Sequence, residues 1–136
     1  MRLASIQSIK NLKNKTVLCR IDLNVELVNG RLDEFSDFKI KQALPTVAWL
    51  LKKGAKVVLL SHFGRPKGRD KKFSLRPFVN YLNKQLGHRP GFLRDPKSAL
   101  EIIKNSKAKL FLLENLRFWP GEEANDPRFA KKLAAL

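Results

Sequence analysis

Three short polar segments of the sequence, 20–24, 61–68 and 114–117, carry side chains suited to a negatively charged ligand. Most of these side chains are cationic or can become so, and an aspartate and an asparagine lie among them. Arginine offers a planar fork of N–H donors that matches the oxygens of a carboxylate or phosphate, and glycine lets the backbone approach a ligand closely. With Lys39 added, the candidate residues are Arg20, Asp22, Asn24, His62, Gly64, Arg65 and Arg117. They indicate a small pocket for a compact, multiply negative molecule that carries a hydroxyl group.

Each candidate residue also has a purely structural interpretation. Arg20 would pair with a surface carboxylate, and Asp22 would cap a turn. A lone histidine is more often structural than ligand-binding, and Arg117 would be an ordinary exposed arginine. We favour ligand binding for His62 because a glycine and an arginine follow it closely at the end of a predicted strand.

The spacing of apolar residues predicts a fold that brings the three segments together. Residues 16–22, 56–60 and 110–113 are short β-branched or apolar runs typical of strands. An amphipathic helix is predicted between the first two runs, and Gly54 ends it. A strand–helix–strand unit of this kind has parallel strands. Because the carboxyl ends of parallel strands share one edge, outside which ligands bind, the three polar segments should converge there.

The remaining elements complete a predicted α/β fold, in which helices flank a parallel sheet in a Rossmann-like, three-layer arrangement. They are an Asn-Gly turn at residues 28–31, a helix from Ser74 to about Leu86, a weak strand at 91–93, a helix at 96–104 and a last helix capped by Asp126. The last helix carries an apolar stripe, and no cap follows it in the sequence. We therefore expect the chain to be the first part of a longer domain.

The composition fits a globular domain with a strongly basic charge. The chain has 136 residues, which suits one domain or part of one, and 43% of them are hydrophobic, which argues against disorder. Lys and Arg total 28 against 12 Asp and Glu, so the formal net charge is +16. The basic residues are dispersed, so the charge affects solubility and ion steering more than it identifies a partner.

A nucleic-acid-binding module is the alternative function that this charge favours. A module of this kind would bind nucleic acid with an affinity that falls steeply as the salt concentration rises.

The sequence excludes several other classes of protein. Cys19 is the only cysteine, which excludes a disulfide scaffold. No apolar run approaches the ~20 residues of a membrane span, and no secretory signal is visible, so we expect a cytoplasmic protein. The glycine motifs of nucleotide sites, metal-ligand spacings and the aromatic-rich basic stripe of a single-strand binder are missing.

Glu122 and Glu123 precede a helix, where they would complement its dipole rather than act as an acid–base pair.

Together and in this order, the polar motifs strongly resemble those of the phosphoglycerate kinase family. The resemblance covers nearly the whole chain and is weakest from about residue 88 to residue 108. The segments that carry it are RIDLNV at 20–25, SDFKI at 36–40, ALPT at 43–46, SHFGRPKG at 61–68, FSL at 73–75, LENLRF at 113–118 and PGEE at 120–123.

The resemblance implies a monomeric kinase of two Rossmann-like domains. The N-terminal domain binds 3-phosphoglycerate or 1,3-bisphosphoglycerate, the C-terminal domain binds Mg-ADP or Mg-ATP, and domain closure allows transfer of the acyl phosphate. Residues 1–136 would belong to the N-terminal domain, with the nucleotide domain outside this chain and with neither nucleic acid nor membrane as a partner.

By resemblance, the residues of this chain fall into distinct roles at the substrate site, and none is a metal ligand. Asp22 and Asn24 would contact the glycerate part, whereas His62, Arg65 and Arg117 would hold its phosphate. The full set of expected substrate-binding residues is Asp22, Leu23, Asn24, Lys39, His62, Phe63, Gly64, Arg65 and Arg117, with Lys39 also in the catalytic position.

Three features depart from the family pattern. The chain stops inside the N-terminal domain, so we expect it to be inactive alone. Lys39 stands where the family has its catalytic arginine, which keeps the charge but loses the fork and should weaken support for the transition state. Glu26 stands where the family usually has proline, and it places a negative charge near the anion site. These departures leave a further alternative, a catalytically inactive anion-binding relic of the same fold.

Overall fold

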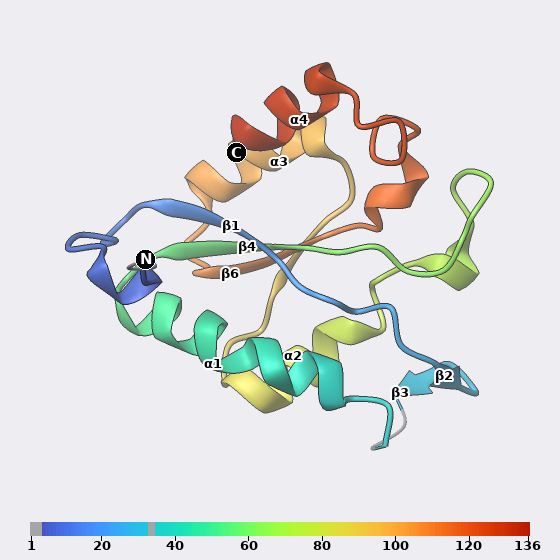
Figure 1. Ribbon diagram of the computed structural model, residues 1–136, viewed down its shortest axis with the longest axis horizontal. Coiled ribbons are helices and arrows are strands. Elements are labelled where there is room, and N and C mark those ends of the chain that lie inside the picture. The colour runs from blue at the N-terminus through green and yellow to red at the C-terminus, as the bar shows by residue number, and fades with distance from the viewer. Residues whose placement is uncertain (1–3, 33–34) are drawn as a thin grey trace.

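A four-stranded parallel β-sheet forms the middle layer of the molecule (Figure 1). The structure is a computed structural model that describes residues 4–32 and 35–136. Neighbouring strands are parallel in all three pairings. Across the sheet the order is β1 (Thr16–Arg20), β4 (Lys56–Leu60), β6 (Leu110–Leu113) and β5 (Gly91–Leu93). The strands expected from the apolar runs are confirmed, although the first ends at Arg20 rather than at Asp22.

Helices cover both faces of the sheet and complete three layers (Figure 1). One face carries α1 (Phe38–Lys52) and α2 (Phe78–Leu86), and the other carries α3 (Pro96–Asn105) and α4 (Pro127–Ala134). The short elements are the 3-10 turns η1 (Ile6–Ser8), η2 (Lys71–Phe73) and η3 (Leu116–Phe118), and the hairpin strands β2 (Leu27–Val28) and β3 (Arg31–Leu32). This architecture confirms the predicted α/β class. Within the described ranges, no helix has the length and apolar character needed to cross a membrane.

Alternate residues of the central strands supply two separate cores. Val57 and Leu59 of β4 belong to the core under α1 and α2, whereas Val58 and Leu60 belong to the core under α3 and α4. Strand β6 alternates in the same way. Successive strand residues point to opposite faces, so a continuous apolar run buries both faces of a sheet. The two cores thus fix the carboxyl ends of β4 and β6, from which two of the polar segments emerge.

One predicted helix start is confirmed by its side-chain contacts, and another is wrong. Asp126 caps α4 as predicted, because its carboxylate accepts a 2.8 Å hydrogen bond from the backbone N–H of Arg128. Ser74, however, does not begin α2, which starts at Phe78. The Ser74 hydroxyl instead donates to Glu114 at 2.8 Å, and this contact holds the chain in a turn for several residues before the helix.

Asp37 occupies the N-cap position of α1, but its carboxylate does not cap the helix. The side chain is buried, accepts a 3.0 Å hydrogen bond from the Tyr81 hydroxyl and pairs with Lys41 at 2.9 Å. The hydrogen bond from Lys41 holds the pKa of the Asp37 carboxyl below its usual value. These contacts tie the first turn of α1 to α2, and they fix the backbone that presents Lys39.

Candidate functional site

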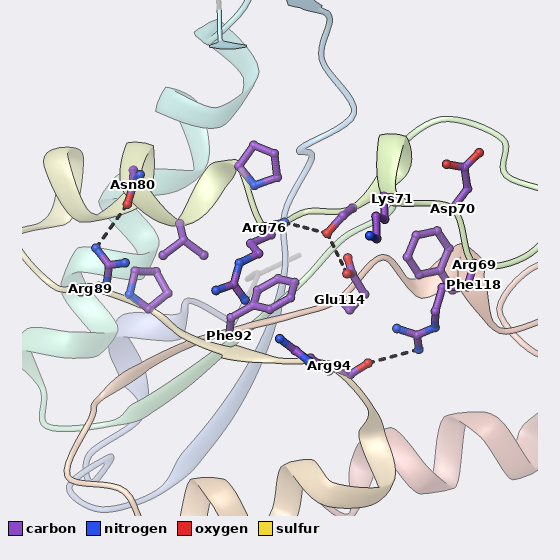
Figure 2. Close-up of a pocket in the computed structure, with 14 residues that line it drawn as sticks. Arg69, Asp70, Lys71, Arg76, Asn80, Arg89, Phe92, Arg94, Glu114 and Phe118 are labelled. Carbon is purple, nitrogen blue, oxygen red and sulfur yellow. Dashed lines mark hydrogen bonds between the residues drawn. The ribbon is translucent and has the colours of Figure 1, made fainter. Parts of the chain in front are cut away.

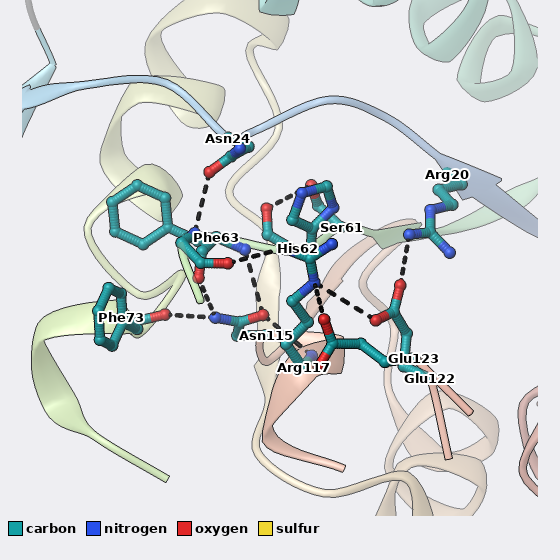
Figure 3. Close-up of polar contacts among 11 residues, drawn as sticks. Arg20, Asn24, Ser61, His62, Phe63, Phe73, Asn115, Arg117, Glu122 and Glu123 are labelled. Atoms are coloured by element: carbon teal, nitrogen blue, oxygen red, sulfur yellow. Dashed lines mark hydrogen bonds and ion pairs between the residues drawn. The ribbon is translucent and has the colours of Figure 1, made fainter. Parts of the chain in front are cut away.

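Two hydrogen bonds join the loop after β1 to the loop after β4. The side chain of Asn24 accepts a 2.9 Å hydrogen bond at Oδ1 from the backbone N–H of Gly64 (Figure 3). The buried hydroxyl of Ser61 accepts another, at 3.0 Å, from the backbone N–H of Leu23. The first two polar segments therefore meet at the carboxyl edge of the sheet, as the parallel topology predicts.

The third polar segment is joined to the second by Asn115, whose side chain is fully buried. Its Oδ1 accepts from the backbone N–H groups of Phe63 and Arg117, both at 3.1 Å. Its Nδ2 donates to the carbonyls of Phe63 at 2.7 Å and Phe73 at 2.9 Å (Figure 3). Four backbone groups are thus satisfied by one amide, so the loop from Phe63 to Phe73 is held at both ends by the carboxyl end of β6.

Glu114 extends this scaffold under the same loop. Its buried carboxylate accepts hydrogen bonds from the backbone N–H groups of Leu75 and Asn115, at 2.9 and 2.8 Å, and from the Ser74 hydroxyl. A buried charge is tolerated only where hydrogen bonds replace its hydration. We infer that Glu114 is a positioning residue for the loop and not a ligand-binding group.

Arg117 lies at the centre of the site and is half-buried. Its Nη1 donates to the Gly64 carbonyl at 2.9 Å, which aims the guanidinium across the loop after β4 (Figure 3). Its Nε lies 3.5 Å from Glu122 Oε2 and 3.6 Å from Glu123 Oε1, and the contact with Glu122 is an ion pair without hydrogen-bond geometry. The Nη2 group makes no hydrogen bond to a described residue, so it is the part of the fork best placed to meet a ligand.

Glu122 also binds Arg20, at 2.7 Å, so a single carboxylate pairs with two arginines (Figure 3). Arg20 therefore pairs with a carboxylate, as its structural interpretation predicted, but this carboxylate is largely buried and not on the surface. The prediction that Glu122 and Glu123 complement the dipole of α4 is wrong, because neither lies in its first turn. The sequence held no signal for the Arg20 pair, whose partners are 102 residues apart.

Lys39 and Asp22 form an exposed ion pair between the first turn of α1 and the loop after β1. Lys39 Nζ lies 3.3 Å from Asp22 Oδ2, and both side chains are well exposed, at 61% and 46%. Asp22 Oδ1 accepts a 2.9 Å hydrogen bond from the backbone N–H of Asn24, so Asp22 also caps the turn, as its structural interpretation predicted. An exposed pair of this kind contributes little stability, and both groups remain available to a ligand.

His62 lies beside Arg117 and is half-buried (Figure 3). Burial is the main cause that lowers the pKa of its imidazole below 6.5, and the positive charge of Arg117 lowers it further. The ring is therefore neutral at pH 7 in the absence of a ligand. A bound anion would favour the imidazolium, so His62 can couple anion binding to proton uptake.

The other predicted site residues differ in what they can offer a ligand. Leu23 is fully buried in the core beneath α1 and α2, and only its backbone can reach the site. Phe63 packs edge-on against Phe73 and Phe78, so its ring is structural as well. Gly64 has a φ of +63°, and a Cβ there would collide with the Phe73 ring. Arg65 is exposed and makes no hydrogen bond or ion pair with any residue that the structure describes.

The assembled site, called the cradle below, gathers cationic and polar side chains at the carboxyl edge of the sheet. Among the described residues, the Arg65 guanidinium and the Nη2 group of Arg117 make no hydrogen bond or ion pair, whereas Lys39 pairs with Asp22. Among residues 4–32 and 35–136, no three His, Cys, Asp or Glu side chains are grouped closely enough to hold a metal ion. Ser61, Glu114 and Asn115 organise the cradle, and their only sequence signal was a polar residue that follows an apolar strand.

The chain is similar to known proteins over nearly its whole length. The family model described as phosphoglycerate kinase matches residues 6–136. The chain is 46% identical over 130 residues to the phosphoglycerate kinase of Dictyoglomus turgidum, covering 93% of this chain and 32% of that protein. It is 45% identical over 131 residues to that of Brucella suis, covering 92% and 32%.

Solved structures give the same result. The phosphoglycerate kinase of Coxiella burnetii superposes with a TM-score of 0.82 at 36% identity, over 99% of this chain and 33% of that one. That of Pyrococcus horikoshii gives 0.78 at 32% identity, over 97% and 34%. The chain thus spans about a third of the length of the relatives it matches.

Proposed function

Since this chain belongs to the phosphoglycerate kinase family, we propose that the cradle at the carboxyl edge of its sheet binds 3-phosphoglycerate or 1,3-bisphosphoglycerate. The observation that carries the proposal is the hydrogen bond of Arg117 to the Gly64 carbonyl, which aims a guanidinium at the loop that bears His62 and Arg65. Residues 1–136 then form part of the substrate-binding N-terminal domain. We expect the protein to work in the cytoplasm.

The proposed roles follow from the donors and acceptors that each side chain retains. Arg65 and the outer edge of Arg117 bind the phosphate group. The His62 ring takes up a proton when the anion binds, and the imidazolium then adds a positive charge to the site. Asn24 binds the N–H of Gly64, whereas Arg117 binds its carbonyl. Asp22 and Asn24 are suited to the hydroxyl and carboxylate of the glycerate. Their own hydrogen bonds hold them in position before the substrate binds.

In the proposed reaction the acyl phosphate of 1,3-bisphosphoglycerate passes to ADP, giving 3-phosphoglycerate and ATP. The nucleotide with its Mg²⁺ would be bound by the second domain of the family. Phosphoryl transfer of this kind depends on positioning and charge stabilisation rather than on covalent catalysis. This chain would orient the bisphosphate through Arg65 and Arg117, and the Lys39 ammonium would stabilise negative charge on the transferring group.

A second candidate function, anion binding without turnover, is favoured by the ion pair of Lys39 with Asp22. A lysine held by a carboxylate offers one point charge where the family has an arginine fork. The two candidates share the same substrate site and differ only in catalysis.

Calorimetric titration with 3-phosphoglycerate tests the proposed site. We expect the chain to bind it, and Arg65→Gln to weaken binding roughly tenfold or more, as for loss of a charge-assisted hydrogen bond. Arg128→Gln, which removes an exposed arginine from α4, is the matched control and should change the affinity by less than threefold. Absence of binding, or equal losses in the two variants, would overturn the proposal. A second assay adds a nucleotide-binding domain from a relative. Turnover would support the kinase function, and binding without turnover would support the inactive anion-binding protein.

A further inference from the structure

A cationic pocket of about 1080 Å³, separate from the site described above, lies beside the edge strand β5 and the start of α2 (Figure 2). Its lining includes none of the residues of the proposed phosphoglycerate site. Five of its lining side chains are cationic, namely Arg69, Lys71, Arg76, Arg89 and Arg94. Two carboxylates also line it, Asp70 and Glu114.

Neither carboxylate neutralises the five cations. Asp70 accepts from the backbone N–H of Lys72 and pairs weakly with its ammonium at 3.7 Å. The Glu114 carboxylate is occupied by the three hydrogen bonds described above. Within the described ranges, none of the five cationic side chains makes an ion pair. The pocket therefore concentrates positive charge that a ligand could balance.

Several of these side chains are held in place by uncharged partners. The guanidinium of Arg76 lies over the Phe92 ring, 5.5 Å from its centroid, and Arg89 Nη1 donates to Asn80 Oδ1 at 3.2 Å (Figure 2). Arg69 lies over the rings of Phe118 and Trp119 and donates to the Arg94 carbonyl at 3.3 Å. Stacking on an aromatic ring leaves the edge donors of a guanidinium free. These guanidinium groups are therefore held in place while their positive charge is not neutralised, as an anion-binding site requires.

We propose that this pocket is a second ligand site, which takes a small organic molecule carrying several phosphate groups. A single phosphate could meet only some of the five cations spread around a pocket of this size, whereas a polyphosphorylated molecule could meet them together. Pro77, Val79 and Phe92 add an apolar lining that suits a carbon skeleton. A nucleic-acid strand is less favoured because bases stack on free aromatic faces, and cations already cover Phe92 and Phe118.

Titration calorimetry with inositol hexakisphosphate as the probe tests this proposal on the 136-residue chain. We expect Arg76→Gln/Arg89→Gln to weaken binding at least tenfold. The matched control, Lys131→Gln/Lys132→Gln, removes two exposed charges from α4 and should weaken it less than threefold. Arg65→Gln should also weaken it less than threefold, because Arg65 belongs to the other site. Circular dichroism tests whether each variant is folded. Arg94→Gln removes another cation from the pocket and replaces the double variant if that variant does not fold.

Three results would overturn the proposal. The pocket double variant and the α4 double variant could weaken binding equally, which would mean that the probe responds to dispersed charge. Arg65→Gln could weaken it as much as the pocket variants do, which would place the probe in the phosphoglycerate site. An oligothymidylate could displace the probe at lower concentration than inorganic tripolyphosphate does, which would identify a nucleic-acid surface. Failure of 3-phosphoglycerate to bind would leave the second site unaffected, so the two proposals fail separately.

Discussion

Asn24 and Gly64 lie 40 residues apart in the sequence, yet the Asn24 amide oxygen accepts a 2.9 Å hydrogen bond from the Gly64 N–H. Arg117 binds the carbonyl of the same glycine. One glycine therefore receives a contact from each of the other two polar segments. The geometry of the proposed substrate site depends on this single residue more than on any of the charged side chains around it.

Gly64→Ala should destabilise the protein and abolish binding of 3-phosphoglycerate. The new methyl group would collide with the Phe73 ring, in addition to the ~1–2 kcal/mol cost of a left-handed backbone. Gly87→Ala is the matched control, because Gly87 has a φ of +66° and open space around it. Urea denaturation should show a loss for Gly64→Ala that exceeds that of Gly87→Ala by about 1 kcal/mol or more. Equal losses would show that the loop adapts and that Phe73 does not constrain it.

Asn115→Ala should lower the free energy of unfolding by about 2–4 kcal/mol, because it leaves buried backbone groups without partners. Asn105→Ala, at an exposed position at the end of α3, should change it by no more than about 0.5 kcal/mol. The measurement is urea denaturation followed by circular dichroism. A loss under about 1 kcal/mol for Asn115→Ala would contradict the role of this residue as the clamp of the loop.

Glu122→Gln should strengthen binding of 3-phosphoglycerate roughly threefold to tenfold, since it removes a nearly buried negative charge that pairs with Arg20 and Arg117. Glu123→Gln is the control, because the Glu123 side chain is 64% exposed and its charge is screened by water. We expect it to change the affinity less than twofold. Weaker binding in Glu122→Gln would mean that the carboxylate orients the arginines more than it neutralises them.

The free energy of unfolding should contain a contribution from His62 that depends on pH. The pKa of His62 is lowered in the folded state, so the unfolded state binds a proton more readily. This contribution is present above pH 6.5, the ordinary histidine value, and is lost as the pH falls through the lowered pKa. The difference in unfolding free energy between the protein and His62→Gln should therefore decrease from pH 7.5 to pH 5. His88→Gln controls for the loss of an imidazole, and a difference that grows on acidification would contradict the account.

Lys39→Arg should raise kcat roughly tenfold when the chain is assayed with a nucleotide-binding domain from a relative, because a guanidinium fork can support two oxygens of the transferring phosphoryl group. Lys41→Arg is the matched control on the same helix, where the side chain pairs with Asp37 instead. It should leave kcat unchanged. A rate for Lys39→Arg that is equal to or below that of the unaltered chain would contradict the proposed role of Lys39.

Most of the fold could be predicted from the sequence because its strands are continuous apolar runs. Residues 56–60 and 110–113 are buried on both faces, and only a central parallel strand requires that pattern. The start of α2 could not be predicted, since Ser74 satisfies the local rule for a helix cap while its hydroxyl is bound to Glu114, 40 residues away. A contact over that separation leaves no local pattern in the sequence.

The candidate site could be predicted only as a set of segments. Parallel topology and strand ends placed Asp22, His62 and Arg117 at one edge. The sequence could not show which arginines pair with a carboxylate. The turn before α4 places Glu122 against Arg20 and Arg117, and this turn leaves no local pattern in the sequence. The basic pocket beside β5 was missed for the same reason: its five cations look dispersed in the sequence and are gathered only by the fold.

Titration of the ¹⁵N-labelled chain with 3-phosphoglycerate, followed by amide NMR, tests whether the phosphoglycerate site lies at the carboxyl edge of the sheet. We expect saturable shifts that are largest at the backbone amides of Asn24, Gly64 and Arg65, with small shifts at Arg76 and Arg89 in the pocket beside β5. Largest shifts in that pocket, or uniform small shifts across the basic surface, would contradict the assignment of the carboxyl edge of the sheet as the phosphoglycerate site.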